Sequence, residues 1–475
     1  MAPYLQPRVD GDLRSILDSH DTLHRMLDTL GSPLNLVLPD RLAANVRDFE
    51  TTLRAYDLGG TVYFAHKANR SSALVRALAT TGAGIDVASL GELQHALGAG
   101  IGPGRIMATG PKSREFLWLA ACTGVTVGAD SVPELAELAG IVAAHGLPRV
   151  RVMARLSGFA STVLSRASRF GVPMKDLDLL WGVLEKHRER LDFQGTAYHL
   201  DTNGLPEKAA ALEGCLEAMA GAQQCGLSPR AIDIGGGFGV NYLADEREWE
   251  AWTTALTEAV LGQRPPITWD GHGYGLRNEG GRLRGALAVY PAYRAVAGPA
   301  YLDRLLATAS TAHRRPLGAL VLDNLYDLHL EPGRALLDQC GAVLTRVEEV
   351  RDGLVRVAAN SNDVALEAHG VLMDPILVPR GEPRPGDGPV EVFLAGNLCL
   401  EADLITRRRV LLPRPPRAGD LLVFANTAGY LMDFSAGSAL MQPTARTVAA
   451  WRHGGDWRWC LDERYWPVTG REETG

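Results

Sequence analysis

The stretch TVYFAHKANRSSALVRALATTGAGIDVAS (residues 61–89) decides the fold of this chain. Two short runs rich in β-branched and apolar residues, 61–69 and 84–89, flank an alanine- and leucine-rich segment with helical spacing at 72–82. Such runs are typical of buried strands, and the segment between them is typical of a helix that ends near a glycine. A strand, a helix and a strand in this order predict a βα unit of a parallel sheet.

The alternation continues far beyond this unit. Six further strand candidates are RIMATG (105–110), VTVGAD (125–130), RVRVMARL (149–156), FQGTAYHL (193–200), AIDIGGG (231–237) and LHLEPGR (328–334). Together with the first two they make eight, the number that closes a (β/α)8 barrel. An open doubly wound sheet uses the same alternation, but no GxGxxG motif follows the first strand, so the barrel is favoured.

The pattern changes past about residue 335, where helix-length patterns become scarce. Antiparallel strands and turns are indicated instead by the segments 341–360, 390–399 and 420–432. PLNLVLP (33–39), which precedes the barrel, is a strand candidate for this second region. We therefore predict an α/β chain in which a barrel is followed by a C-terminal β-domain that also takes in the N-terminal segment.

The predicted parts have approximate boundaries. They are an N-terminal segment (1–42), the barrel (43–335) and the β-domain (336–475). Within the barrel, residues 241–327 are too many for one crossover, so they predict an insertion with helices of its own.

The composition excludes several classes of protein. The 475 residues hold 48 Lys and Arg against 55 Asp and Glu, so no basic excess is available to bind nucleic acid. Apolar runs stop well short of the ~20 residues of a membrane helix, and the charged start is unlike a secretory signal. The six cysteines form no CxxC pair and are too scattered for a zinc site. We expect a cytoplasmic protein with no metal and no membrane partner.

Functional groups of a (β/α)8 barrel lie at the carboxyl ends of its strands. The predicted ends carry Lys67, Asp86, Arg155, His199, Gly235, Gly236, Gly237, Glu331 and Arg334. A solvated lysine, a hydrogen-bonded histidine or a flexible glycine turn would explain each one singly. Their placement on successive strand ends favours one shared site.

These residue types suit pyridoxal phosphate. Lys67 can form a Schiff base with the cofactor aldehyde, and the three glycines can present backbone N–H groups to the phosphate. Glu331 can keep the pyridine nitrogen protonated, which makes the ring an electron sink. His199 can pack on the ring face, and Arg334 can reach phosphate oxygens.

Six motifs, in order, resemble the fold type III pyridoxal-phosphate decarboxylases of the diaminopimelate, ornithine and arginine group. They are FAHKAN (64–69), GIDVASLGEL (84–93), YHLDTNG (198–204), DIGGGF (233–238), LEPGR (330–334) and CLEAD (399–403). The resemblance covers about residues 33–450. It implies a Schiff base at Lys67, His199 over the ring, and Thr202 where the family has serine; Arg155 also matches.

The resemblance further implies a head-to-tail homodimer with shared active sites. AGY (428–430) resembles the family's Gly-Ala-Tyr, which assigns Tyr430 to the phosphate. Cys399, the first residue of the CLEAD motif, is the expected donor of the proton that returns to Cα. Both residues are expected to act in the neighbouring subunit's site.

The departures from the family concern the substrate. Leu400 stands where an acid usually grips a distal amine, with Glu401 shifted by one position. In AANSNDV (358–364), Asn360 or Asn362 replaces an expected acid. We assign Asn360, Leu400, Glu401 and Asp403 to substrate binding. The expected substrate is a modified or unusual amino acid, of the kind used in specialised metabolism.

The predicted reaction is decarboxylation of an α-amino acid. A racemase or epimerase on the same fold is the alternative, and it needs a base on each face of Cα. The retained Cys399–Asp403 motif and the chain length favour decarboxylation. A cofactor-binding homologue without activity would keep the glycines but lose Lys67 or Cys399, and both are present.

Overall fold

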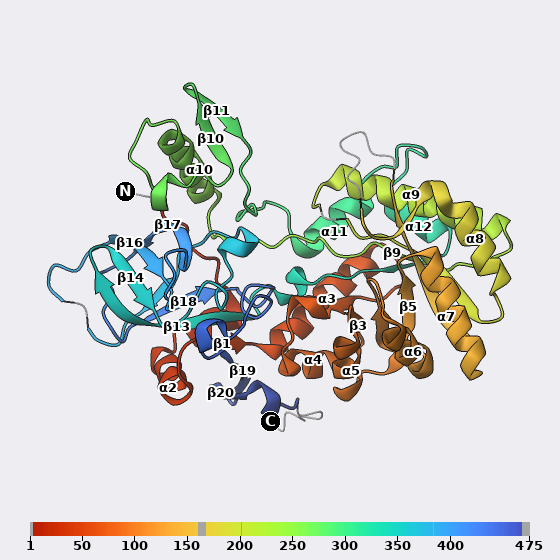
Figure 1. The fold of residues 1–475 in the computed structure, drawn as a ribbon, viewed down its shortest axis with the longest axis horizontal. Helices are drawn as coiled ribbons and strands as arrows, with labels where there is room; N and C mark the ends of the chain where they lie inside the picture. The colour runs from red at the N-terminus through yellow and green to blue at the C-terminus, as the bar shows by residue number, and fades with distance from the viewer. Residues whose placement is uncertain (1–2, 160–167, 201, 383, 468–475) are drawn as a thin grey trace.

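Eight parallel strands form a barrel in one lobe of the molecule (Figure 1). The computed structural model describes residues 3–159, 168–200, 202–382 and 384–467. The strands, in spatial order, are β2 (Tyr63–Ala65), β3 (Gly84–Val87), β4 (Ile106–Ala108), β5 (Thr126–Ala129), β6 (Val150–Ser157), β8 (Leu191–Ala197), β9 (Ala231–Asp233) and β12 (Asp327–His329). All eight coincide with predicted strands.

The last strand region returns to the first and closes the barrel. Val62 pairs with Leu330 in a parallel bridge, and the Tyr63 N–H donates to the Leu330 carbonyl at 2.7 Å. The Leu330 N–H in turn donates to the carbonyl of Thr61 at 3.1 Å. The barrel prediction is confirmed, because an open sheet would leave these two edges unpaired.

Helices cover the outside of the barrel, and serine residues cap several of them. They include α4 (Ser72–Ala79), α5 (Leu90–Gly98), α6 (Arg114–Thr123), α7 (Val132–His145), α8 (Leu177–Lys186) and α9 (Leu205–Gln224). At the first four of these, the preceding serine accepts a hydrogen bond from the third helical N–H, as at Ser89 and Glu92. This satisfies a backbone donor that the helix itself cannot pair.

A second lobe is built from β-strands that lie within the residues predicted to form the β-domain. They are β13 (Gly341–Arg351), β14 (Leu354–Val357), β15 (Ile376–Val378), β16 (Val390–Ala395), β17 (Leu404–Leu412), β18 (Leu421–Ala425), β19 (Arg446–His453) and β20 (Asp456–Leu461). Strand β1 (Leu34–Val37) lies between β13, antiparallel, and β19, parallel. The predicted strand before the barrel is therefore part of the β-domain sheet.

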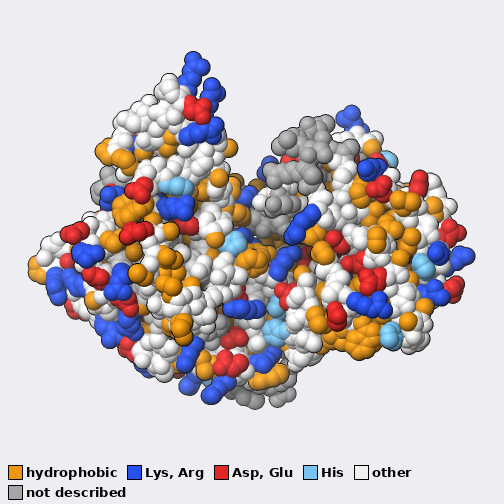
Figure 2. Space-filling view, in the orientation of Figure 1, with side chains coloured by type: hydrophobic (Ala, Val, Ile, Leu, Met, Phe, Trp, Pro, Cys, Tyr) orange, Lys and Arg blue, Asp and Glu red, His pale blue; other side chains and the backbone are white. Residues whose placement is uncertain are grey.

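The long segment before β12 divides between the two lobes. Helix α10 (Glu246–Val260) and the hairpin of β10 (Leu276–Glu279) and β11 (Arg282–Gly285) project above the β-domain, with basic side chains at the tip (Figures 1 and 2). The Arg409 N–H of β17 donates to Ile267 at 3.0 Å, which anchors this part. Helices α11 (Gly298–Ala307) and α12 (Leu317–Asp323) instead pack on the barrel, against α3 (Pro39–Ala55) and α9.

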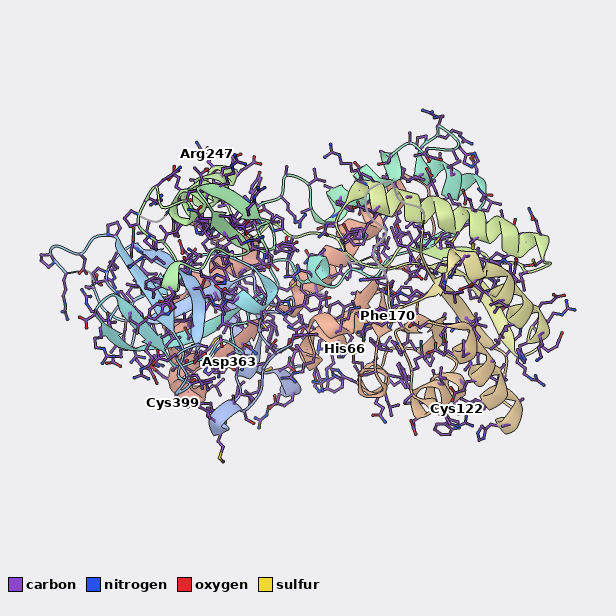
Figure 3. All side chains as sticks on the ribbon, turned by 45° about the horizontal axis from the view of Figure 1, so that its top comes forward. His66, Cys122, Phe170, Arg247, Asp363 and Cys399 are labelled. Carbon is purple, nitrogen blue, oxygen red and sulfur yellow. The ribbon has the colours of Figure 1, made fainter. Side chains whose placement is uncertain are left out.

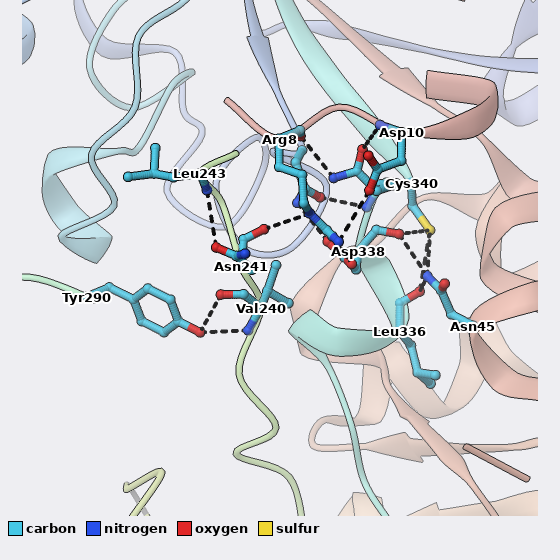
Figure 4. A network of polar contacts seen from close by, with 12 residues as sticks. Arg8, Asp10, Asn45, Val240, Asn241, Leu243, Tyr290, Leu336, Asp338 and Cys340 are labelled. Carbon is cyan, nitrogen blue, oxygen red and sulfur yellow. Dashed lines mark hydrogen bonds and ion pairs between the residues drawn. The ribbon is translucent and has the colours of Figure 1, made fainter. Parts of the chain in front are cut away.

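The N-terminal residues fasten the junction between the lobes (Figure 4). Arg8 pairs with Asp338, and its backbone N–H donates to the carbonyl of Tyr242 at 2.7 Å. The Asn45 amide donates to the carbonyls of Leu336 and Asp338, both at 2.8 Å. The segment that leaves the barrel is thus held from both sides.

A fully buried ion pair in the β-domain gives a stability prediction. Asp374 accepts from Arg408 at 2.6 Å and from the Leu5 N–H at 2.9 Å, and neither side chain of the ion pair is exposed. We expect Asp374→Ala to lower the free energy of unfolding by about 3–5 kcal/mol, because it leaves a buried guanidinium unpaired. Glu137→Ala, which breaks an exposed pair with Arg114, should change it by less than about 1 kcal/mol. Denaturant titration of both variants tests this, and equal losses would contradict it.

Candidate active site

The carboxyl ends of the barrel strands open into a cavity of about 610 Å³. Lys67, in the short 3₁₀ turn η1 (His66–Ala68) after β2, lines it together with Arg155 of β6. His199 follows β8 and Glu331 follows β12, and both also line the cavity. Four of the predicted strand-end residues therefore line one cavity, and their assignment to a cofactor stays a prediction.

Acidic groups surround the Lys67 amine. Burial alone would favour the neutral amine, but Asp86, Tyr430 and Glu331 outweigh it and raise the pKa of Lys67 above its ordinary value. Asp86 is itself buried and accepts a hydrogen bond from the Thr109 hydroxyl. A positively charged group is thus held among buried acidic groups.

Glu331 has the environment of a carboxyl that can keep a proton. Its pKa is raised well above the ordinary value by burial and then by the neighbouring charges of Asp86 and Asp233. Burial also raises the pKa of Asp233 to about 7. A pyridine nitrogen beside Glu331 would find a partner able to share a proton.

His199 is a neutral ring rather than a cation. Its pKa is lowered well below the ordinary value by burial and by the charges of Lys67 and Arg155. Nδ1 accepts the Gly236 N–H at 3.1 Å, which fixes the orientation of the ring. An uncharged, oriented imidazole suits packing against a cofactor ring.

The triple glycine forms a turn that admits no side chain. Gly235 and Gly237 have φ of +63° and +80°, and a Cβ on Gly236 would lie 2.7 Å from the carbonyl oxygen of Glu331. Gly235 donates its N–H to Asp233 at 2.7 Å. The loop brings bare backbone to the mouth of the barrel, which fits a phosphate group. Of the three N–H groups expected to face a phosphate, those of Gly235 and Gly236 already donate within the chain, so the expectation holds for Gly237 alone.

Arg334 and Tyr430 lie together beside this mouth. The Arg334 guanidinium donates to the Tyr242 hydroxyl at 2.6 Å and lies 5.1 Å from the centre of the Tyr430 ring. The Tyr430 N–H donates to the Ala68 carbonyl at 2.8 Å, directly after Lys67. The expectation that Tyr430 serves the neighbouring subunit is wrong, because the segment after β18 packs on η1 of its own chain.

The other β-domain residues that were predicted to act on the substrate do not reach this cavity. Cys399 is exposed and lies on the β-domain, apart from His66 and Phe170 of the barrel (Figure 3). Leu400 and Glu401, next along the chain, are also exposed. A role for these three residues in this chain's own cavity has no geometric support.

Asp403 and Asn360 make hydrogen bonds within the β-domain. Both are buried, and the Asp403 carboxylate accepts the N–H groups of Ser361 at 2.9 Å and Leu398 at 2.8 Å. The Asn360 side-chain oxygen accepts the Asn362 N–H at 3.0 Å. Within this chain they hold the loops that present Cys399, and their assignment to the substrate stays a prediction.

Several residues of the site were not predicted. Thr109 directly follows β4 and could have been found by the same strand-end rule as Lys67. Phe170, which lines the cavity, packs 4.7 Å from the Arg155 guanidinium. Tyr242 and Tyr290 enclose Arg334, and no local pattern reveals such a tertiary contact.

Comparisons with known proteins agree with this geometry. The family described as "Pyridoxal-dependent decarboxylase, pyridoxal binding domain" matches residues 40–283. The Sinorhizobium fredii protein y4yA is 34% identical over 419 residues, 85% of this chain and 84% of its own. Diaminopimelate decarboxylase of Methanothermobacter thermautotrophicus is 27% identical over 432 residues, 86% of this chain and 85% of its own.

Solved structures show the same fold. A mutant of Helicobacter pylori diaminopimelate decarboxylase, in a complex with L-lysine, has a TM-score of 0.68 at 18% identity and covers 92% of this chain and 95% of its own. Arginine decarboxylase of Paramecium bursaria Chlorella virus has a TM-score of 0.66 at 16% identity, covering 90% of this chain and all of its own.

The family match and the relative at 34% identity show which family the chain belongs to. The cavity is lined by residue types that suit pyridoxal phosphate. In the described ranges no helix combines the length and apolar character that crossing a bilayer requires. The chain belongs to the pyridoxal-dependent decarboxylases, enzymes that release the carboxylate of an amino acid as CO2.

Proposed function

We propose that the chain decarboxylates an α-amino acid with a large, modified side chain rather than a simple diamino acid. The observation that carries this is the Lys67 amine at the floor of a roomy, largely apolar cavity. Met107, Leu156, Phe159 and Leu200 supply apolar walls. The resemblance to diaminopimelate and arginine decarboxylases supports the reaction, while the walls support the difference in substrate.

The cofactor and the chain divide the chemistry. When bound, pyridoxal phosphate supplies an aldehyde for amines and a ring that accepts the electron pair left by CO2. Lys67 offers the amine that holds the aldehyde, and Glu331 holds a proton for the ring nitrogen. His199 supports the ring face, and the glycine loop receives the phosphate. The buried walls keep water away from the reacting carbon.

The charges available to a substrate differ from those of a diamino-acid site. Leu400 replaces the acid that would grip a distal amine, and it is 58% exposed. On the barrel side, Glu207 lines the cavity, and Arg155 forms an ion pair with Asp130 at 3.7 Å. An uncharged or acylated distal group would pack on the apolar walls and would not depend on Glu207 for a counter-charge.

We also propose a homodimer with shared active sites. Cys399 and the loop that carries it are exposed, and this chain's own cavity lies at the other lobe. A second copy can bring Cys399 to the cavity as the proton donor to Cα. The six cysteines are all unpaired, which supports a reducing compartment such as the cytoplasm.

The substrate proposal predicts the result of a CO2-release screen. The panel holds L- and D-amino acids, free diamino acids and their acyl conjugates. We expect CO2 from a member with a modified side chain, and none from Lys67→Ala, which should also lose the visible absorbance of lysine-bound cofactor. Efficient turnover of free diaminopimelate or ornithine would overturn the substrate class. Loss of optical rotation without CO2 would instead indicate the racemase alternative.

Shared sites predict complementation between inactive variants. Lys67→Ala and Cys399→Ala, carrying different affinity tags, are co-expressed and compared with each parent. Random pairing leaves half of the dimers mixed, each with one intact site, so activity should recover to about a quarter of the native level. Activity no higher than the parents' sum would contradict a site that combines Lys67 with the partner's cysteine.

The glycine loop predicts a specific defect in cofactor binding. Gly236→Ala would press a methyl group against the carbonyl of Glu331, so we expect cofactor affinity to fall at least about tenfold. Gly98→Ala, on a helix with open space around it, is the control and should leave affinity unchanged. Cofactor titration and thermal unfolding of the apoenzyme measure both; unchanged affinity in Gly236→Ala would count against the phosphate assignment.

A further inference from the structure

A buried lysine lies directly behind the triple glycine. Lys208 is in the first turn of α9, and its side chain has no exposed surface. Its ammonium donates to the carbonyl oxygen of Gly236 and lies 4.8 Å from the centre of the Phe238 ring. None of the roles described above uses this group.

The described contacts of the Lys208 ammonium are a backbone carbonyl and two aromatic faces. Within the described ranges no carboxylate lies at ion-pair distance from it, and burial lowers its pKa to about 7. The faces of Phe238 and Tyr301, at 4.8 and 5.7 Å, offset only part of the cost of a buried cation. An anion on the far side of the glycine loop would supply the missing counter-charge.

The hydrogen bond from Lys208 also sets the direction of one peptide plane. In a trans peptide the C=O and the N–H point in opposite directions, so the Gly237 N–H is turned away from the ammonium. Gly235 and Gly236 donate to Asp233 and His199. No described residue accepts from the Gly237 N–H, which leaves this donor for a ligand. A cation on the carbonyl polarises the peptide and strengthens that donor.

We propose that Lys208 is the positioning residue of the phosphate cradle. Its ammonium aims the Gly236–Gly237 peptide at the cofactor phosphate and places a positive charge behind it. The inference rests on the cofactor alone. It can therefore fail while the substrate proposal holds, and the reverse is also true.

Binding of two forms of the cofactor separates this role from a structural one. Pyridoxal phosphate and pyridoxal, which lacks the phosphate, are titrated into apoenzyme in buffer free of phosphate and sulfate. For Lys208→Met we expect the affinity for pyridoxal phosphate to fall at least about tenfold, while that for pyridoxal changes less than about twofold. Lys208→Arg keeps the charge and a donor, and should restore most of the loss.

A second buried lysine of the barrel is the matched control. Lys112 also has no exposed side-chain surface, but it pairs with Glu134 at 3.0 Å. Lys112→Met should change the two affinities by the same factor. If Lys208→Met does not fold, as judged by thermal unfolding of the apoenzyme, Lys208→Gln takes its place. Equal losses for both cofactor forms, or unchanged affinity for pyridoxal phosphate, would overturn the proposal.

Discussion

The hydrogen bonds between residues 59–63 and 328–330 close the barrel, and the site depends on that closure. They set the end of β12 beside the end of β2, and so bring Glu331 to Lys67. The approach is very close: a Cβ on Gly60 would lie 1.9 Å from the carbonyl oxygen of Leu328. With the edges open, Lys67 would lose an acidic neighbour and the cavity would lose a wall.

The end of the closed barrel brings buried charges of both signs close together. Asp86, Asp233 and Glu331 are buried near the cations Lys67 and Arg155. Interactions between such groups are much stronger than in water, so each protonation state depends on the others. The same surroundings that make Lys67 a cation keep His199 neutral. A ligand with a phosphate and a ring nitrogen would bring a negative group for the cations and a proton-sharing nitrogen for Glu331.

Much of the architecture could be predicted because parallel strands place their carboxyl ends at one edge. That rule located Lys67, His199 and Glu331 from local patterns alone. It gave no information on Tyr430, because its position depends on how the segment after β18 packs on η1. Lys208 lies in an alanine-rich helix, and only the packing of α9 on the glycine loop shows that it points inward. The burial of Asp403 likewise depends on contacts between separate loops.

The position of β1 has a consequence for the synthesis of the chain. This strand pairs with β13 and β19, which begin at Gly341 and Arg446, so it leaves the ribosome long before either partner exists. The barrel can assemble from local βα units during translation, whereas the β-domain sheet must wait for the end of the chain. Until then, this apolar strand near the N-terminus of the nascent chain has two unpaired edges. Folding chaperones that shield such edges should therefore matter more for this lobe than for the barrel.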